Sequence, residues 1–145
     1  MTKPRIQAGA LCLKITDKSR LHVLLVTSRD TGRWVIPKGW PADGDSLSGA
    51  ALREAFEEAG VRGSVGTNPI GEYSYVKREK NGERELNVYV YALFVDTLAS
   101  QWPEKDQRKR QWFDLELAAN KVDEPELSAM MTELAGNADM VDSTK

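Results

Sequence analysis

Three glutamates and an arginine lie close together in the segment 46–61, SLSGAALREAFEEAGV. At about 100° per residue in a helix, Glu54, Glu57 and Glu58 fall within roughly a third of the circumference. The pattern predicts a helix with a carboxylate cluster along one side. Like charges three or four residues apart destabilise a helix by about 0.2–0.5 kcal/mol per pair. We therefore expect this cluster to be retained for its chemistry.

The cluster needs a countercharge, and its sequence neighbours supply little of it. Arg53, on the flank, is the cation that we expect to reach Glu57. Hard divalent cations such as Mg²⁺ prefer oxygen ligands and would neutralise the whole face. A solvated acidic helix face is the alternative for REAFEEAG taken alone, so the flanking residues decide between the two interpretations.

The flanking residues extend the pattern towards the N-terminus. Gly39 is followed after five residues by Asp45, and Arg53 follows after seven more. The segment 39–61 closely resembles the Nudix box, G-x(5)-E-x(7)-R-E-U-x-E-E-x-G-U, in which U is aliphatic. The matching residues are Gly39, Arg53, Glu54, Ala55, Glu57, Glu58, Gly60 and Val61. Asp45 stands where the box has glutamate, which keeps the charge but shortens the side chain by one methylene.

The resemblance implies an enzyme that hydrolyses a phosphoanhydride in a nucleoside diphosphate linked to another group. It implies Mg²⁺ as cofactor, replaceable by Mn²⁺, with Glu57, Glu58 and the carbonyl of Gly39 as ligands. Glu54 would bind metal or act as general base on the attacking water, and Arg53 would orient Glu57. Carboxylate-bound Mg²⁺ ions can activate a water and stabilise a leaving phosphate.

The sequence has few histidine and cysteine residues, which disfavours the catalytic mechanisms that depend on them. The sequence has one histidine, His22, and one cysteine, Cys12, which lies in an apolar run and is expected in the core. A histidine-based zinc site or a Ser–His triad is therefore disfavoured. Glu104 and Asp106, in a later loop, could add a carboxylate, although such isolated acids are more often solvated.

Basic and hydroxyl residues outside the helix match one branch of the family over about residues 5–119. The segments SRDTGRWVIPKG, NVYVYALFV and W-x(5)-RKRQWF are similar to the diphosphoinositol polyphosphate phosphohydrolase branch, which also cleaves diadenosine polyphosphates. Lys38, beside the box, is a further phosphate ligand that we predict, and a solvated basic surface is the alternative. The resemblance implies phosphate contacts by Arg5, Thr27, Ser28, Arg29, Arg84 and Arg108 or Arg110.

The substrate stays open between two candidates. Lys38-Gly39-Trp40 stands where the diphosphoinositol branch usually has three glycines, and Pro-Lys-Gly is more typical of diadenosine polyphosphate hydrolases. Trp40 could stack on a base or pack against its own loop. Nucleotide sugars and nucleoside triphosphates are alternative substrates. A non-catalytic Nudix-like binding domain is the alternative from another class, and the three retained helical carboxylates argue against it.

The composition is that of a globular domain. The chain has 145 residues, 41% hydrophobic and 29% charged, with a net charge of −2. This balance gives no reason to expect nucleic acid or an anionic membrane as partner, so the expected partner is a small-molecule polyphosphate. No apolar run approaches the ~20 residues of a membrane span. The N-terminal residues lack a convincing signal peptide, so we predict a cytoplasmic location.

Apolar runs and turn signals predict the elements. Asn81-Gly82 predicts a hairpin, Asp45 or Ser46 caps the acidic helix, and Gly60 ends it. This mixture predicts an α/β fold, and the resemblance implies a Nudix fold, an α/β/α sandwich with a mixed central sheet. We expect one domain over residues 1–135 and a frayed tail over 136–145. The expected strands are 6–15, 21–28, 34–36, 73–78, 86–95 and 112–113, with a loop at 38–45 and later helices at 115–120 and 125–134.

Overall fold

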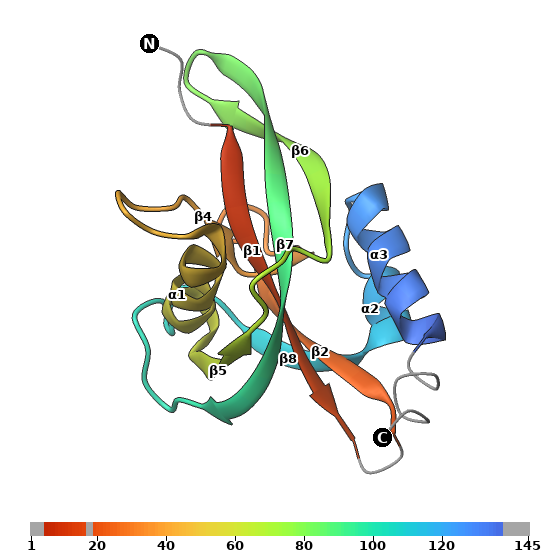
Figure 1. Ribbon diagram of the computed structural model, residues 1–145. Helices are drawn as coiled ribbons and strands as arrows, with labels where there is room; N and C mark the ends of the chain where they lie inside the picture. The colour runs from red at the N-terminus through yellow and green to blue at the C-terminus, as the bar shows by residue number, and fades with distance from the viewer. Residues whose placement is uncertain (1–4, 17–18, 138–145) are drawn as a thin grey trace.

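The computed structural model describes residues 5–16 and 19–137 and contains one mixed sheet between helices (Figure 1). Three helices are present in this part of the chain: α1 (Leu47–Ala59), α2 (Leu115–Ala119) and α3 (Pro125–Gly136). The strands are β1 (Ile6–Ile15), β2 (Leu21–Thr27), β3 (Trp34–Val35), β4 (Lys38–Gly39), β5 (Val61–Val65), β6 (Gly71–Glu79), β7 (Gly82–Leu98) and β8 (Arg110–Asp114).

The sheet is organised around the parallel pair β1 and β7. Strands β3, β2, β1, β7 and β5 lie in that order, with β4 on β1, β6 on β7 and β8 on β2. All these pairs except β1–β7 are antiparallel. Strand β2 is buried along Val23–Val26, as its unbroken apolar run predicts.

Helices cover both faces of the sheet, which confirms the predicted α/β/α sandwich. Helix α1 lies on one side, and α2 and α3 lie on the other (Figure 1). Two apolar clusters fill the layers: one contains Leu127 and Met131 of α3, and the other contains the alanines of α1. Cys12 is fully buried in the second cluster, as predicted for a core residue.

Helix α1 begins and ends where its sequence predicts. The Ser46 hydroxyl accepts a hydrogen bond from the Gly49 amide at 3.0 Å, which satisfies one free donor of the first turn. Gly60 adopts φ 68°, the left-handed conformation that favours glycine. Ala51 and Ala55 are buried against the sheet. The small alanines let the helix lie close to β1, so its glutamates are held near the sheet edge.

Several sequence predictions need correction, and three of them concern the sheet most directly. Residues 38–39 form β4 on β1, where we expected a loop. Strand β5 went unpredicted because VRGSV is short and contains glycine, and it forms by pairing with β7. Strand β7 extends to Leu98, well beyond the predicted segment, because it pairs with β6 along its first part and with β5 along its last.

The C-terminal prediction is corrected in part. Helix α3 continues to Gly136, so the helix ends two residues later than the predicted range, and residue 136 belongs to it. Residues 138–145 of the predicted tail lie outside the described residues. No helix in the described part of the chain is long and apolar enough to span a membrane.

Candidate active site

A cleft with a volume of about 600 Å³ opens beside α1, where Glu54 and Glu58 line it. Its lining comes from strands β1, β3, β4 and β6, the loop 28–33, helix α1 and the β7–β8 connection. Sheet pairing brings these segments together, although they span most of the chain. The lining residues with polar or aromatic groups include Gln7, Ser28, Arg29, Arg33, Lys38, Trp40, Glu54, Glu58, Tyr75, Lys77, Glu104 and Arg108.

Glu54, Glu58 and Gly39 form one side of this cleft, which we call the carboxylate wall. The Glu54 carboxylate packs directly against Gly39, where any Cβ would collide with it. Glu58 is buried, although the sequence places it on the acidic face and not on the apolar one. Two of the three glutamates of this helix thus line the cleft, and Glu54 lies against the backbone of β4.

Burial raises the pKa of both carboxyl groups in this wall. It raises the pKa of Glu58 to about 8, and the nearby charges of Arg108 and Lys38 oppose that shift. Burial and then the charge of Glu57 raise the pKa of Glu54, while hydrogen bonding with Glu58 and Arg53 lowers it. Two acids held together and away from water disfavour full ionisation. A cation placed between them would favour it.

The carboxylate wall fits a hard divalent cation. Nudix hydrolases generally use divalent metal ions. Mg²⁺ in proteins is commonly bound by one or two carboxylates, with water or substrate oxygens completing its shell. Glu54, Glu58 and the Gly39 backbone offer oxygen donors of that kind. Across the residues that the structure describes, no three acidic, histidine or cysteine side chains form a complete metal-ligand group, so water and substrate would supply the remaining ligands.

Arg53 braces the loop between β4 and α1. Its guanidinium donates to the Asp45 carboxylate and, at 2.8 Å, to the carbonyl of Trp40. The shorter Asp45 side chain therefore reaches the arginine, and it also accepts from the Ala42 amide at 2.9 Å. Arg53 lies 3.9 Å from Glu57, a looser contact than the predicted orienting ion pair. Glu57 is not among the residues that line the cleft.

Arg29, Arg33 and Arg108 line the same cleft, and we call these three arginines the basic wall. Arg108 is buried and pairs with Glu104 at 2.8 Å and with Glu58 at 3.7 Å. Arg53 is therefore not the only cation that reaches the acidic helix face, because tertiary contacts add Arg108. Arg29 donates to Gln107 at 3.0 Å.

Glu104 is a cleft residue, although its isolated loop position favoured a solvated acid. Its side chain is largely buried, and its amide donates to the carbonyl of Glu57 at 3.0 Å. This bond fastens the β7–β8 connection to α1. Glu104 had no spacing signal in the sequence, because its place depends on a contact between distant segments.

Lys38 lies at the floor of the cleft with Tyr75. The Lys38 ammonium is 4.9 Å from the Tyr75 ring centroid, and the Tyr75 hydroxyl donates to Gln7 at 2.8 Å. Burial lowers the pKa of Lys38, while the charge of Glu58 and then of Glu124 raises it. Tyr75 and Gln7 are cleft residues without a recognisable sequence motif.

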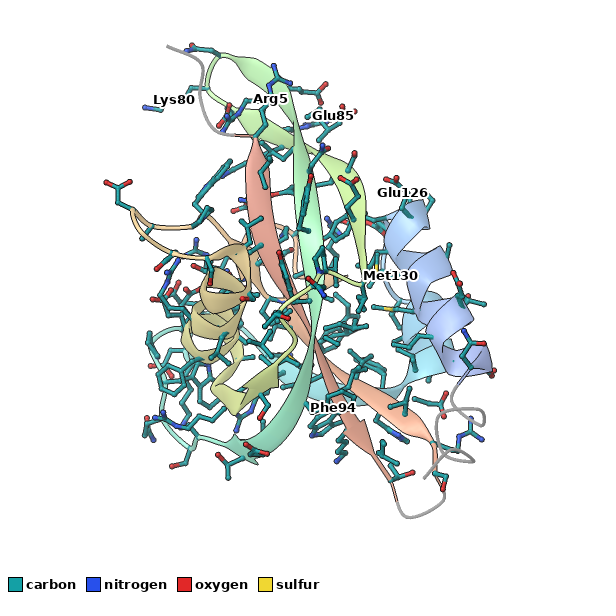
Figure 2. The ribbon with its side chains drawn as sticks, in the orientation of Figure 1. Arg5, Lys80, Glu85, Phe94, Glu126 and Met130 are labelled. Carbon is teal, nitrogen blue, oxygen red and sulfur yellow. The ribbon has the colours of Figure 1, made fainter. Side chains whose placement is uncertain are left out.

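Four predicted phosphate ligands do not line the cleft. Arg5 precedes β1, its carbonyl accepting from Asn87 at 2.8 Å, and Figure 2 shows it near the tip of the β6–β7 hairpin. Thr27 accepts from Arg108 through its carbonyl, at 3.1 Å. Arg84 pairs with Glu79 at 3.1 Å, and Arg110 donates to the last turn of α1. Their roles in substrate binding stay predictions.

A family model of the NUDIX domain matches residues 5–134. The chain therefore belongs to the Nudix family, as its box predicts. Its solved structural neighbours include a C. elegans Ap4A hydrolase, with a TM-score of 0.63 and 19% identity, covering 92% of this chain and 98% of that one. The NUDIX domain of Shewanella oneidensis NrtR, solved with ADP ribose, aligns with a TM-score of 0.68 and 19% identity, covering 92% and 89%. At these identities the neighbours show the fold.

Curated relatives by sequence include members of the predicted branch. The chain is 38% identical over 110 residues to diphosphoinositol polyphosphate phosphohydrolase 3-beta of Bos taurus, covering 74% of this chain and 63% of that protein. It is 33% identical over 107 residues to Nudix hydrolase 13, mitochondrial, of Arabidopsis thaliana, covering 70% and 53%. The chain thus spans less than two thirds of the length of these relatives.

Proposed function

We propose that this domain is a metal-dependent phosphoanhydride hydrolase acting on a polyphosphorylated small molecule. One observation carries the proposal: buried carboxylates and several arginines line the same cleft. The carboxylate wall suits a divalent cation, and the basic wall suits the phosphates that such a cation would help to neutralise. The relatives named as phosphohydrolases support the same reaction class.

The metal site would use the carboxylate wall. Glu54, Glu58 and the Gly39 carbonyl would hold Mg²⁺, or Mn²⁺ in its place. Glu57 stays a predicted ligand from the rim, because it lies outside the lining residues. When bound, the metal supplies an activated water and charge stabilisation at the leaving phosphate. Arg53 would keep the Gly39–Trp40 backbone in place through its bond to the Trp40 carbonyl.

Proton removal from the attacking water falls to a carboxylate of this wall. We assign it to Glu54, whose carboxylate lies against Gly39 and is only partly buried. Ser28, Arg29, Lys38 and Arg108 would bind the phosphate oxygens. Arg108 suits this role because a guanidinium forks onto two oxygens at once, and its pairing to Glu104 fixes its orientation.

The substrates that we favour are diphosphoinositol polyphosphates and diadenosine polyphosphates. Relatives bear the first name and a structural neighbour bears an Ap4A hydrolase title. A cleft lined by several cations suits a long phosphate chain better than a diphosphate joined to a neutral group. One relative carries a mitochondrial name, so the predicted cytoplasmic location rests on the sequence alone.

A phosphate-release panel tests the proposal. Purified protein is incubated with Mg²⁺ or excess chelator and diadenosine polyphosphates, diphosphoinositol polyphosphates, nucleotide sugars, nucleoside triphosphates or capped RNA. We expect Mg²⁺-dependent turnover and a higher kcat/KM for the first two classes than for ADP-ribose. The reverse ranking would favour the nucleotide-sugar alternative, and no turnover of any substrate would favour a non-catalytic binding domain.

A further inference from the structure

Glu124 is a buried carboxylate that the hydrolytic chemistry leaves unused. It immediately precedes α3 and is 6% exposed. Its two oxygens accept from the two terminal nitrogens of Arg33, at 2.6 and 3.3 Å. Burial of a charged group is costly unless it is paired with good geometry. The two hydrogen bonds, which we call the fork, therefore indicate that the buried charge of Glu124 serves to hold the Arg33 side chain.

Because Glu124 fixes Arg33, it also restrains the loop 28–33 that lines the cleft. Arg33 closes this loop, because its carbonyl accepts from the Ser28 amide at 2.8 Å. Gly32, at φ 71°, provides the left-handed turn that brings the loop back. Ser28 and Arg29, both predicted phosphate ligands, lie at the other end of the same loop. Fixing Arg33 thus also fixes the loop that carries them.

Arg33 keeps hydrogen-bonding capacity for a ligand. A guanidinium has five N–H donors, and the fork to Glu124 uses two. Within residues 5–16 and 19–137, its other carboxylate contact is Asp123 at 3.6 Å, beyond hydrogen-bonding distance. Arg33 lines the cleft, whereas Glu124 does not. Arg33 is therefore fixed by the Glu124 carboxylate, which lies outside the cleft lining, and keeps N–H donors for a ligand in the cleft.

We infer that Glu124 is a positioning residue for phosphate binding: it orients Arg33, and with it the Ser28–Arg33 loop, toward the phosphate chain of the substrate. This inference rests on the proposed function for the identity of the anion. Arg33 then contacts a phosphate directly, and Glu124 acts only through Arg33. A purely structural brace would hold α3 to the loop without changing affinity for phosphate.

Asp123 provides a matched control. It neighbours Glu124 and approaches the same guanidinium, but its side chain is 73% exposed. Exposed ion pairs contribute little because solvent and salt screen them. Asp123→Asn removes one negative charge next to Arg33, as Glu124→Gln does, without breaking the fork. The two variants therefore separate the effect of geometry from the effect of local charge.

The experiment measures binding of inorganic tripolyphosphate to the metal-free protein by calorimetry, together with steady-state hydrolysis in Mg²⁺. We expect Glu124→Gln and Arg33→Lys each to weaken tripolyphosphate binding about tenfold, as expected for loss of a charge-assisted contact. KM should rise by a similar factor with kcat changed less than about threefold. Asp123→Asn should stay within about twofold of wild type. The double variant Arg33→Lys/Glu124→Gln should lose no more than either single variant.

Several results would overturn the inference. One is wild-type affinity in Glu124→Gln with only a lower melting temperature, which would show a brace alone. Equal losses in Asp123→Asn, or no tripolyphosphate binding by the wild type, would also exclude it. Wild-type protein that binds tripolyphosphate but hydrolyses no substrate would refute the proposed function instead, and the binding data would still decide the role of Glu124.

Discussion

The two walls of the cleft differ in how their charged side chains are paired. The carboxylate wall gathers acidic side chains from one helix, and burial raises the pKa of Glu54 and of Glu58. In the basic wall, each arginine is already matched by an acid: Arg29 by Glu104, Arg33 by Glu124 and Arg108 by both Glu104 and Glu58. The first wall is completed only by a cation, whereas the second is ordered before any ligand arrives.

This difference predicts which property, turnover or folding stability, a substitution in each wall should change. Removing an acid from the carboxylate wall should relieve repulsion and remove metal affinity, so it should affect turnover more than folding. Removing a member of the basic wall should leave buried acids without a partner, so it should affect both ligand affinity and folding. Metal addition should separate the two responses.

The largest effect is expected for Glu58→Gln. The change keeps the shape of the side chain and removes its charge from the metal site. We expect turnover to fall at least ~10²-fold, the scale of losing a key electrostatic group. Initial rates at saturating Mg²⁺ and substrate measure this loss of turnover. Glu133→Gln, an exposed glutamate on α3, is the control, and near-wild-type turnover in Glu58→Gln would remove the metal hypothesis.

The next effect concerns Arg108→Met, which keeps the apolar stem and removes the guanidinium. Glu58 and Glu104 lose their shared countercharge, so the metal-free protein should unfold at lower denaturant and KM should rise about tenfold. Mg²⁺ should recover part of the lost stability, because the cation replaces the positive charge near Glu58. Urea unfolding with chelator or with Mg²⁺ measures the change in stability, and steady-state kinetics measure the change in KM.

Arg20→Met is the matched control for Arg108→Met. Arg20 pairs with Asp114 at 2.6 Å but is exposed and lies away from the cleft lining. An exposed pair contributes about 0–1 kcal/mol, and KM should not change. Equal losses in the two variants would show that Arg108 has no special place in the site.

A smaller effect of opposite sign is expected for Glu54→Gln without metal. The charge of Glu57 raises the pKa of Glu54, so removing the Glu54 charge should stabilise the variant by a few tenths up to ~1 kcal/mol while activity falls sharply. Saturating Mg²⁺ should stabilise the wild type by about 2.7 kcal/mol at a hundred times the dissociation constant, and the variant by less. Denaturation curves with chelator and with Mg²⁺ measure these differences. A destabilised variant that gained as much from Mg²⁺ would make Glu54 structural.

The smallest effect tests the brace beside the carboxylate wall. The Ala42 amide and then Arg53 hold the pKa of Asp45 below its ordinary value of 3.8. A lowered folded-state pKa adds stability above 3.8 that is lost as pH falls through the folded value. Wild type should therefore exceed Asp45→Asn in melting temperature near pH 7, and the gap should close below about pH 4. A gap independent of pH would contradict this linkage.

The sequence by itself determined the local parts of this protein. An apolar run and the polar turn after it predicted β1 to its ends, and the serine cap and left-handed Gly60 set the bounds of α1. Spacing along one helix placed Glu54 and Glu58 together, and the box identified the family. These features are readable because helix periodicity, capping and turn chemistry depend on residues a few positions apart.

Only the tertiary structure decided the basic wall and the pKa shifts of the acids. Arg108 reaches the site because β8 pairs with β2, and Glu104 reaches it because its connection is bonded to α1. The fork between Arg33 and Glu124 joins side chains 91 positions apart. Such contacts follow from strand order and sheet pairing, which bring distant segments together without any spacing rule. Burial, the cause of the raised pKa of Glu58, likewise exists only after the layers have packed.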